Sequence, residues 1–198
     1  MELLIIRHAL PRRVETEDGS PADPALSSLG HRQARALAEW MVDEKIDVIH
    51  VSPMRRARET AAPLEAALGV EAMVTEGVSE YDRHADAYIP LEELKATDYE
   101  TWSEMVRSGM GLEDPVTFQQ LVVDTIEDIV ATNPGRRVAI VCHGGVISSY
   151  AAHVLGKPPG DIFFFEPAYT SVNRFLAAGS GERSLVSLNE RGHLRGLT

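Results

Sequence analysis

The sequence predicts an α/β fold, a three-layer α/β/α sandwich around a mostly parallel sheet. The first observation is a set of short apolar runs typical of buried strands, clearest at residues 2–7, 47–51 and 137–142. The second is that segments with apolar residues at helical spacing follow these runs. Strands that alternate with helices favour a parallel sheet covered by helices on both faces.

The elements can be placed in chain order from their spacing and their end signals. Ser27 or Ser28 can cap the first helix, Gly69 can end the second, and Asn133-Pro134-Gly135 stops the longest one. We expect strands at residues 2–7, 47–51, 72–75, 137–142, 170–177 and 184–189. We expect helices at residues 28–43, 54–68, 91–107, 115–132 and 145–155.

Composition limits the possible partners. The 198 residues include 30 acidic and 19 basic side chains, so the formal net charge is -11, and such a chain repels nucleic acid. No segment has the length of an apolar membrane span or the pattern of a signal peptide. Cys142 is the only cysteine, so no internal disulfide can form. We therefore expect a cytoplasmic protein with no membrane or nucleic-acid partner, and a homodimer is possible.

Polar residues stand where three of the expected strands end. Arg7 and His8 follow the first strand, the segment 52–56 follows the second, and His143 follows the strand at 137–142. In parallel sheets, ligands bind beyond the carboxyl ends of the strands. We therefore expect these segments, remote in sequence, to meet at one edge of the sheet.

These residue types suit a tetrahedral phosphoryl group. A neutral imidazole such as that of His8 is a competent nucleophile near pH 7. The guanidinium groups of Arg7 and Arg56 can hold phosphate oxygens, and His143 begins a helix whose backbone N–H groups favour anions. A departing oxygen also needs a proton, which Glu80 in the segment SEYDR could supply. Asp82 and His84 are rivals that the residues alone do not rank.

Four segments carry a resemblance to a known family. They are LLIIRHA (3–9), LSSLGHRQA (26–34), SPMRRARETA (52–61) and VAIVCHGGVI (138–147). In order and spacing they resemble the histidine phosphatase superfamily, also called phosphoglycerate mutase-like. The resemblance implies that this fold extends over residues 1–198 as a single domain, with a variable, lid-like insertion at about 76–113.

The resemblance also implies roles. His8 would carry the phosphoryl group, and Glu80 would be the proton donor. Arg7, Arg56 and His143 would hold the phosphoryl group, with the backbone N–H of Gly144 beside it. No metal or organic cofactor is expected, and the substrate would be a small phosphorylated molecule.

The chain departs from the family pattern at a few positions. Ala9 stands where glycine is usual, and Val14 stands where many members have an asparagine that contacts the phosphoryl group. Arg12 or Arg13 could compensate, although a solvated pair is the simpler interpretation. The aromatic run Phe163 to Phe165 is expected to pack into the core. Tyr88, Trp102 and Met105 are expected in helix packing, with a substrate lid as the alternative.

The leading hypothesis is a phosphatase that hydrolyses a phosphomonoester through a phosphohistidine on His8. The alternative is a phosphoglycerate-mutase-type phosphomutase, which must shield its phosphoenzyme from water. The sequence has no extended C-terminal tail for that purpose, which favours hydrolysis. A further alternative is a phospho-ligand binding protein without significant catalysis. The remaining histidines are expected to be structural or exposed: His31, His50, His153 and His193.

Overall fold

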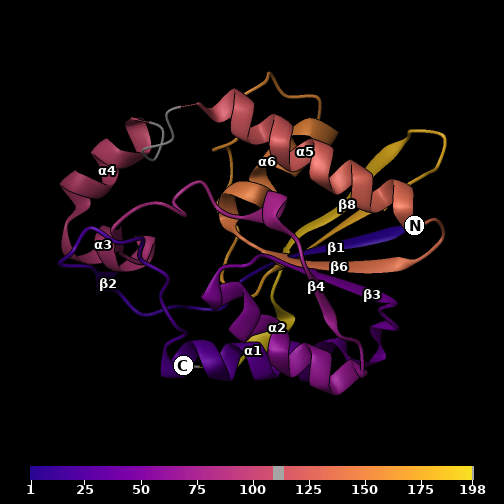
Figure 1. Ribbon diagram of the computed structural model, residues 1–198, viewed down its shortest axis with the longest axis horizontal. Coiled ribbons are helices and arrows are strands. Elements are labelled where there is room, and N and C mark those ends of the chain that lie inside the picture. The colour runs from indigo at the N-terminus through magenta and orange to yellow at the C-terminus, as the bar shows by residue number, and fades with distance from the viewer. Residues whose placement is uncertain (109–113, 198) are drawn as a thin grey trace.

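The computed structural model describes residues 1–108 and 114–197, and it is built around a six-stranded sheet (Figure 1). The strand order is β4-β3-β6-β1-β7-β8. The bounds are β1 Glu2–Arg7, β3 Val48–Val51, β4 Ala72–Val74, β6 Arg137–Cys142, β7 Val172–Ala177 and β8 Arg183–Glu190. The first four strands of that order pair in parallel, whereas β7 and β8 pair antiparallel. The predicted mostly parallel sheet is confirmed.

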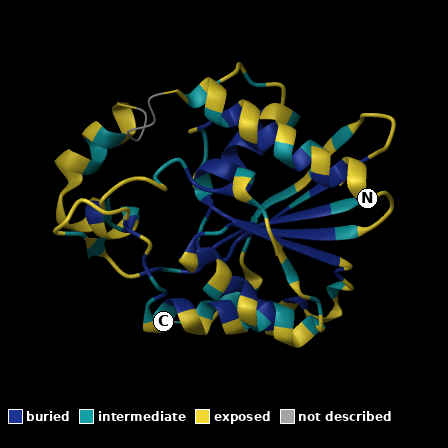
Figure 2. Ribbon diagram, viewed as in Figure 1, coloured by how far each residue is buried: buried dark blue, intermediate teal, exposed yellow. Residues whose placement is uncertain are grey.

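Helices cover both faces of the sheet, so the predicted three layers are confirmed. Helices α5 (Pro115–Thr132) and α6 (Gly144–Val154) lie on one face, and α1 (Ser28–Met41) and α2 (Arg55–Leu68) lie on the other (Figure 1). In Figure 2 the central strands β1, β3 and β6 are mostly dark blue, that is buried, between these two helical layers, whose outer faces are largely yellow.

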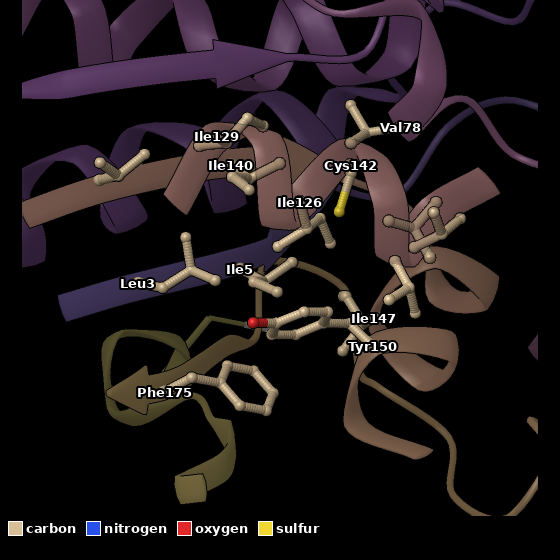
Figure 3. Packing of buried hydrophobic residues seen from close by; sticks show 14 of the residues in the cluster. Leu3, Ile5, Val78, Ile126, Ile129, Ile140, Cys142, Ile147, Tyr150 and Phe175 are labelled. Atoms are coloured by element: carbon tan, nitrogen blue, oxygen red, sulfur yellow. The ribbon is translucent and has the colours of Figure 1, made fainter. Parts of the chain in front are cut away.

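Alternation along the strands builds two cores, because successive side chains of a strand point to opposite faces. Leu3 and Ile5 of β1 pack with α5 and α6, whereas Leu4 and Ile6 pack with α1 and α2. Figure 3 shows the α5–α6 side, where the rings of Tyr150 and Phe175 meet edge to face. Cys142 belongs to this buried cluster, as expected.

Local signals fix the ends of the helices. The Ser27 hydroxyl accepts a hydrogen bond from Gly30 N–H at 3.0 Å and so caps α1. Gly69 ends α2 with φ +67°, a left-handed conformation that glycine adopts without strain. Short 3₁₀ turns that the spacing does not predict complete the layers, at η1 Val42–Glu44, η2 Glu76–Val78 and η3 Gly192–Leu194.

The segment between β4 and α5 differs from its prediction. Instead of one helix at residues 91–107 there are two, α3 (Leu91–Thr97) and α4 (Tyr99–Arg107). Asp98 breaks the helix with φ −148° and caps α4, because its carboxylate accepts from Thr101 N–H at 3.0 Å. Both helices lie to one side of the sheet (Figure 1). Residues 109–113 of the expected insertion lie outside the described residues.

A small second sheet joins the start of the chain to this segment. Strand β2 (Val14–Glu15) pairs antiparallel with β5 (Ala87–Tyr88). Val14, which the resemblance places where many family members have an asparagine, is therefore a partner of Tyr88 in this ladder. Strands of two residues are too short to show an alternation of apolar and polar side chains, so the sequence does not predict this sheet.

An ion-pair network ties the amino ends of β1 and β6 to their neighbours. Arg174 of β7 contacts Glu44 at 2.6 Å, Glu190 at 3.0 Å and Glu2 at 3.2 Å. Arg137 pairs with Glu2 as well. These pairs lie at the opposite end of the parallel strands from Arg7 and His143. None of the helices in the described residues has the length and apolar character required to cross a bilayer.

Candidate active site

The carboxyl ends of β1 and β6 and the first turn of α2, the helix that follows β3, border one cleft of about 1180 Å³. Arg7, His8, Arg56, Glu80 and Gly144 all line it. His143 lies behind this lining, with its ring centroid 5.1 Å from that of His8. Every residue predicted for the site is therefore brought to the same place, from segments as much as 137 positions apart in the sequence.

The ring of His8 is held in one tautomer. Its Nδ1 lies 2.8 Å from the carbonyl oxygen of Ala9, which can only accept a hydrogen bond, so Nδ1 carries the proton. The lone pair of the neutral ring is then on Nε2. Burial, with the charges of Arg56 and Arg7, holds the pKa of His8 well below its ordinary value, so the ring is neutral at pH 7.

A serine positions the second histidine. Nε2 of His143 lies 2.7 Å from the hydroxyl of Ser52, which follows β3. Nδ1 of His143 is buried and has no hydrogen-bond partner within the described chain. Burial, together with Arg56 and the neighbouring His8, keeps the pKa of His143 well below its ordinary value. The ring can therefore offer one nitrogen to a bound group.

The two arginines are buried, and each lies over a tyrosine ring. The guanidinium of Arg7 lies 4.1 Å from the ring centroid of Tyr169, and that of Arg56 lies 4.6 Å from the ring of Tyr88. Asp82 accepts a hydrogen bond from Arg56 Nη2 at 2.8 Å. The two tyrosine rings and the Asp82 carboxylate hold the guanidinium planes in place, but they leave some of the N–H donors without a partner.

Several donors of this cluster have no partner among the described residues. They are Arg7 Nε, Arg56 Nε and Arg56 Nη1, all buried. Buried polar atoms are nearly always hydrogen-bonded, so unsatisfied donors of two fixed cations indicate an anion site. An oxyanion bound beside His8 would satisfy them.

Glu80 is a carboxyl group that holds its proton near neutral pH. Burial, with the charge of Asp82, raises the pKa of Glu80 to about 7. Its oxygens accept hydrogen bonds from Gly145 N–H at 2.9 Å and Tyr81 N–H at 3.2 Å. At neutral pH it can therefore give a proton and, once ionised, take one back.

The structure separates Glu80 from the two rivals that sequence reasoning left open. Asp82 is bound to Arg56. His84 is exposed, and its Nε2 accepts a hydrogen bond from Arg83 at 3.1 Å. Glu80 is buried and bound to the start of α6, next to His143.

The two glycines after His143 serve different purposes. A Cβ on Gly145 would lie 2.3 Å from Glu80 Oε1, a distance that real contacts never reach. A Cβ on Gly144 would meet Arg7 Nε at 3.7 Å, an ordinary contact. The close approach of Glu80 to the backbone therefore requires glycine at position 145 but not at position 144. The sequence alone did not distinguish the two glycines.

The remaining expectations have mixed outcomes. Arg12 and Arg13 are exposed and do not line the cleft, and Arg13 pairs with Glu15 and Glu93, so the solvated-pair interpretation is confirmed. The core-packing expectation for Phe163 to Phe165 is wrong in part. Phe164 and Phe165 pack against the core, yet all three rings line the cleft and Phe163 is exposed.

Tyr88, Trp102 and Met105 were expected in helix packing, with a substrate lid as the alternative. All three line the cleft, so helix packing alone does not describe their place. The other histidines lie away from it: His31 is beside Glu59, His50 contacts Thr75, His153 is exposed, and His193 stacks on Trp40.

Sequence reasoning missed the residues that hold the site in shape. Ser52 and Gly145 stand inside segments that were singled out, so the signal was their place in those segments, whereas Tyr169 stands just before the strand expected at 170–177. Asp82 was weighed only as a rival acid, not as the partner of Arg56. Within the described residues, no group of three or more His, Cys, Asp or Glu side chains is arranged to hold a metal ion.

Solved structures share this fold. A phosphoserine phosphatase mutant from Entamoeba histolytica in complex with phosphoserine has a TM-score of 0.74 at 21% identity, and 98% of each chain is covered. The complex of a mycobacterial glucosyl-3-phosphoglycerate phosphatase with inorganic phosphate has a TM-score of 0.75 at 21% identity, with 97% of this chain and 98% of that chain covered.

Sequence relatives point to the same group. A protein of Hydrogenobacter thermophilus, provisionally named phosphoserine phosphatase 2, is 26% identical over 204 residues, covering 99% of this chain and 98% of that protein. The model of the histidine phosphatase superfamily (branch 1) matches residues 3–191. That match includes every residue of the cluster described above, and the chain belongs to the histidine phosphatase superfamily, a family of phosphatases.

Proposed function

We propose that this protein hydrolyses a phosphomonoester through a phosphohistidine formed on His8. In the first step Nε2 of His8 attacks phosphorus, the bond from phosphorus to the ester oxygen breaks, and the carboxylic acid of Glu80 protonates that oxygen. In the second step water attacks phosphorus, the N–P bond breaks, and the carboxylate of Glu80 accepts the proton of the water. Each step leaves the proton count balanced, and Glu80 ends in its starting form.

The observation that carries the proposal is the set of unsatisfied donors around the His8 ring. Arg7 and Arg56 present buried N–H groups without partners. Nδ1 of His143 is also unpartnered, and it is a donor in the tautomer in which Nε2 accepts the Ser52 hydroxyl proton. Donors fixed before the reaction stabilise the charge that develops on the equatorial oxygens, which is the larger part of phosphoryl-transfer catalysis. The N–H of Gly144 at the start of α6 would add to them, since Gly144 lines the cleft and the N–H of Gly145 is bound to Glu80.

The segment from η2 to α4 would act as a lid-like insertion in a single domain. Two of its residues support this role. Tyr88 lies against Arg56, and Glu92 of α3 lies 3.8 Å from Arg7 Nη1. A substrate that binds the two arginines would therefore also meet this segment.

The test is to trap the intermediate. Purified protein is mixed with a ³²P-labelled phosphomonoester, quenched rapidly in alkali, in which phosphohistidine survives, and digested for peptide mapping. We expect label on the peptide that contains His8, and none in His8→Ala. The matched control is His31→Ala, a half-exposed histidine outside the cleft, which should be labelled as the parent is. Full turnover by His8→Ala would overturn the mechanism.

The same preparation distinguishes the two other functions. With 3-phosphoglycerate, isomerisation that outpaces release of inorganic phosphate would identify a phosphomutase. If the protein binds a phosphomonoester but neither becomes labelled on His8 nor releases phosphate, it is a binding protein. Hydrolysis is expected because the cleft is large and open to the water that the second step consumes.

A further inference from the structure

We propose that the alcohol released at this site is bulky and apolar or aromatic, and that small alcohols carrying a carboxylate are disfavoured. The inference rests on the proposed function, because the role of Glu80 fixes the side from which the alcohol departs. The leaving oxygen must come within hydrogen-bonding reach of the Glu80 carboxyl group. The chemistry of the wall beside Glu80 therefore describes the leaving group.

An aromatic cluster adjoins Glu80. The ring of Tyr81 meets that of Phe118 edge-on at 5.8 Å between centroids, and that of Phe163 edge-on at 6.0 Å. A Cβ on Gly145 would lie 3.0 Å from Tyr81 Cδ1 and 3.1 Å from Glu80 Cδ, so both side chains pack on the same stretch of backbone. An alcohol protonated by Glu80 would contact this cluster directly.

Apolar side chains extend the cluster along the cleft. Trp102, Met105 and Val106 of α4 line it on one side, and Leu121 of α5 and Phe163 line it as well. Val106 is 41% exposed, Leu121 47% and Phe163 39%. Single exposed apolar residues are ordinary, but three that line one concave surface mark a ligand site. This wall buries its apolar area only when an apolar group enters.

The charges that line the cleft oppose a second anionic group. Among the described residues Arg7 and Arg56 are needed by the phosphoryl group, and Arg83 is the remaining arginine of the lining. Arg83 is exposed and donates a hydrogen bond to Nε2 of His84. The carboxylates that line the rest of the described wall are those of Glu76, Asp114 and Glu166. A carboxylate on the substrate would find repulsion here and no buried cation.

Three esters of primary alcohols test the inference. They are propyl phosphate, 3-phenylpropyl phosphate and 3-carboxypropyl phosphate, whose leaving oxygens have similar basicity, so their kcat/KM values compare binding rather than intrinsic reactivity. We expect 3-phenylpropyl phosphate to exceed propyl phosphate by roughly tenfold or more, since a phenyl ring buries substantial apolar area in the transition state. We expect 3-carboxypropyl phosphate to fall below propyl phosphate.

Variants assign the preference to the wall. Phe163→Ala and Leu121→Ala should each reduce the ratio of kcat/KM for 3-phenylpropyl over propyl phosphate. The matched control is Val186→Ala, an apolar residue of β8 that is 56% exposed and lies outside the cleft lining, and its ratio should equal that of the parent. Phosphate release from all three esters at similar rates would overturn this inference alone. No release from any of them would overturn the proposed function, and this inference with it.

Discussion

Replacing Gly145 by alanine tests the role of Glu80 without touching its carboxyl group. The added Cβ would lie 2.3 Å from Glu80 Oε1, so the carboxyl group must move away. Its hydrogen bond from Gly145 N–H, now 2.9 Å long, would then be lost or lengthened. Gly145 is buried in the first turn of α6, so the added methyl group should also strain the fold, by about 1–3 kcal/mol, as is usual for small-to-large changes in a packed region. Stability measured on the same samples separates that cost from the loss of the general acid.

The size of the effect follows from the chemistry that is displaced. A positioned general acid contributes about 10²–10⁴-fold to a rate. An ester of an alkyl alcohol needs that acid, because its leaving oxygen is strongly basic. We therefore expect kcat for propyl phosphate to fall by at least ~100-fold in Gly145→Ala. An ester of 4-nitrophenol, whose anion leaves without a proton, should lose far less.

The assay is steady-state phosphate release from the two esters, with thermal unfolding measured on the same samples. Gly179→Ala is the matched control, because its Cβ would meet no atom within 4 Å and Gly179 lies outside the cleft lining, so kcat for both esters should equal that of the parent. If Gly145→Ala kept kcat for propyl phosphate within about threefold, less than ~1 kcal/mol of barrier, the assignment of Glu80 would be refuted. Equal losses with both esters would point to general damage of the site instead.

The remaining predictions concern pH, positioning and stability. Since the pKa of Glu80 is about 7, kcat for alkyl esters should fall as the pH rises above 7, and in pH–rate profiles Asp82→Asn should move that fall to lower pH by removing a negative charge. Ser52→Ala should lower kcat/KM about tenfold by releasing the His143 ring, and Ser52→Thr should restore it. Arg174→Ala should lower the free energy of unfolding in urea by roughly 2 kcal/mol with kcat unchanged, and a null effect would mean that its three ion pairs are fully screened.

The sheet was predictable because burial on both faces leaves a plain mark in the sequence. In β1 and β6 nearly every side chain is buried, so each reads as a continuous apolar run. The residue after such a run must lie at the carboxyl edge of the sheet, whatever its neighbours. This is why His8 and His143 could be brought together from the sequence alone.

The wall of the cleft was not predictable in this way. Helix α4 is largely exposed, and its apolar residues face a ligand cleft and not the core, so their spacing resembles ordinary helix packing. The expectation that Phe163 packs into the core was wrong because its exposed ring also lines this cleft. The break at Asp98 did carry a signal, since aspartate is a preferred N-cap and Thr101 lies at the position it binds. A helical pattern continuing on both sides hid it.

Glu80 shows why a proton donor is harder to find than a nucleophile. His8 is fixed by its own strand, but the position of Glu80 depends on an amide from α6, a helix that begins more than sixty positions later. Within the segment SEYDR, burial and that amide separate Glu80 from Asp82, and neither is visible in the segment itself. The informative residue lies elsewhere: a glycine whose missing side chain leaves room for a carboxyl group. The acid of this site is therefore better sought from the space beside Gly145 than from the acidic residues of the loop.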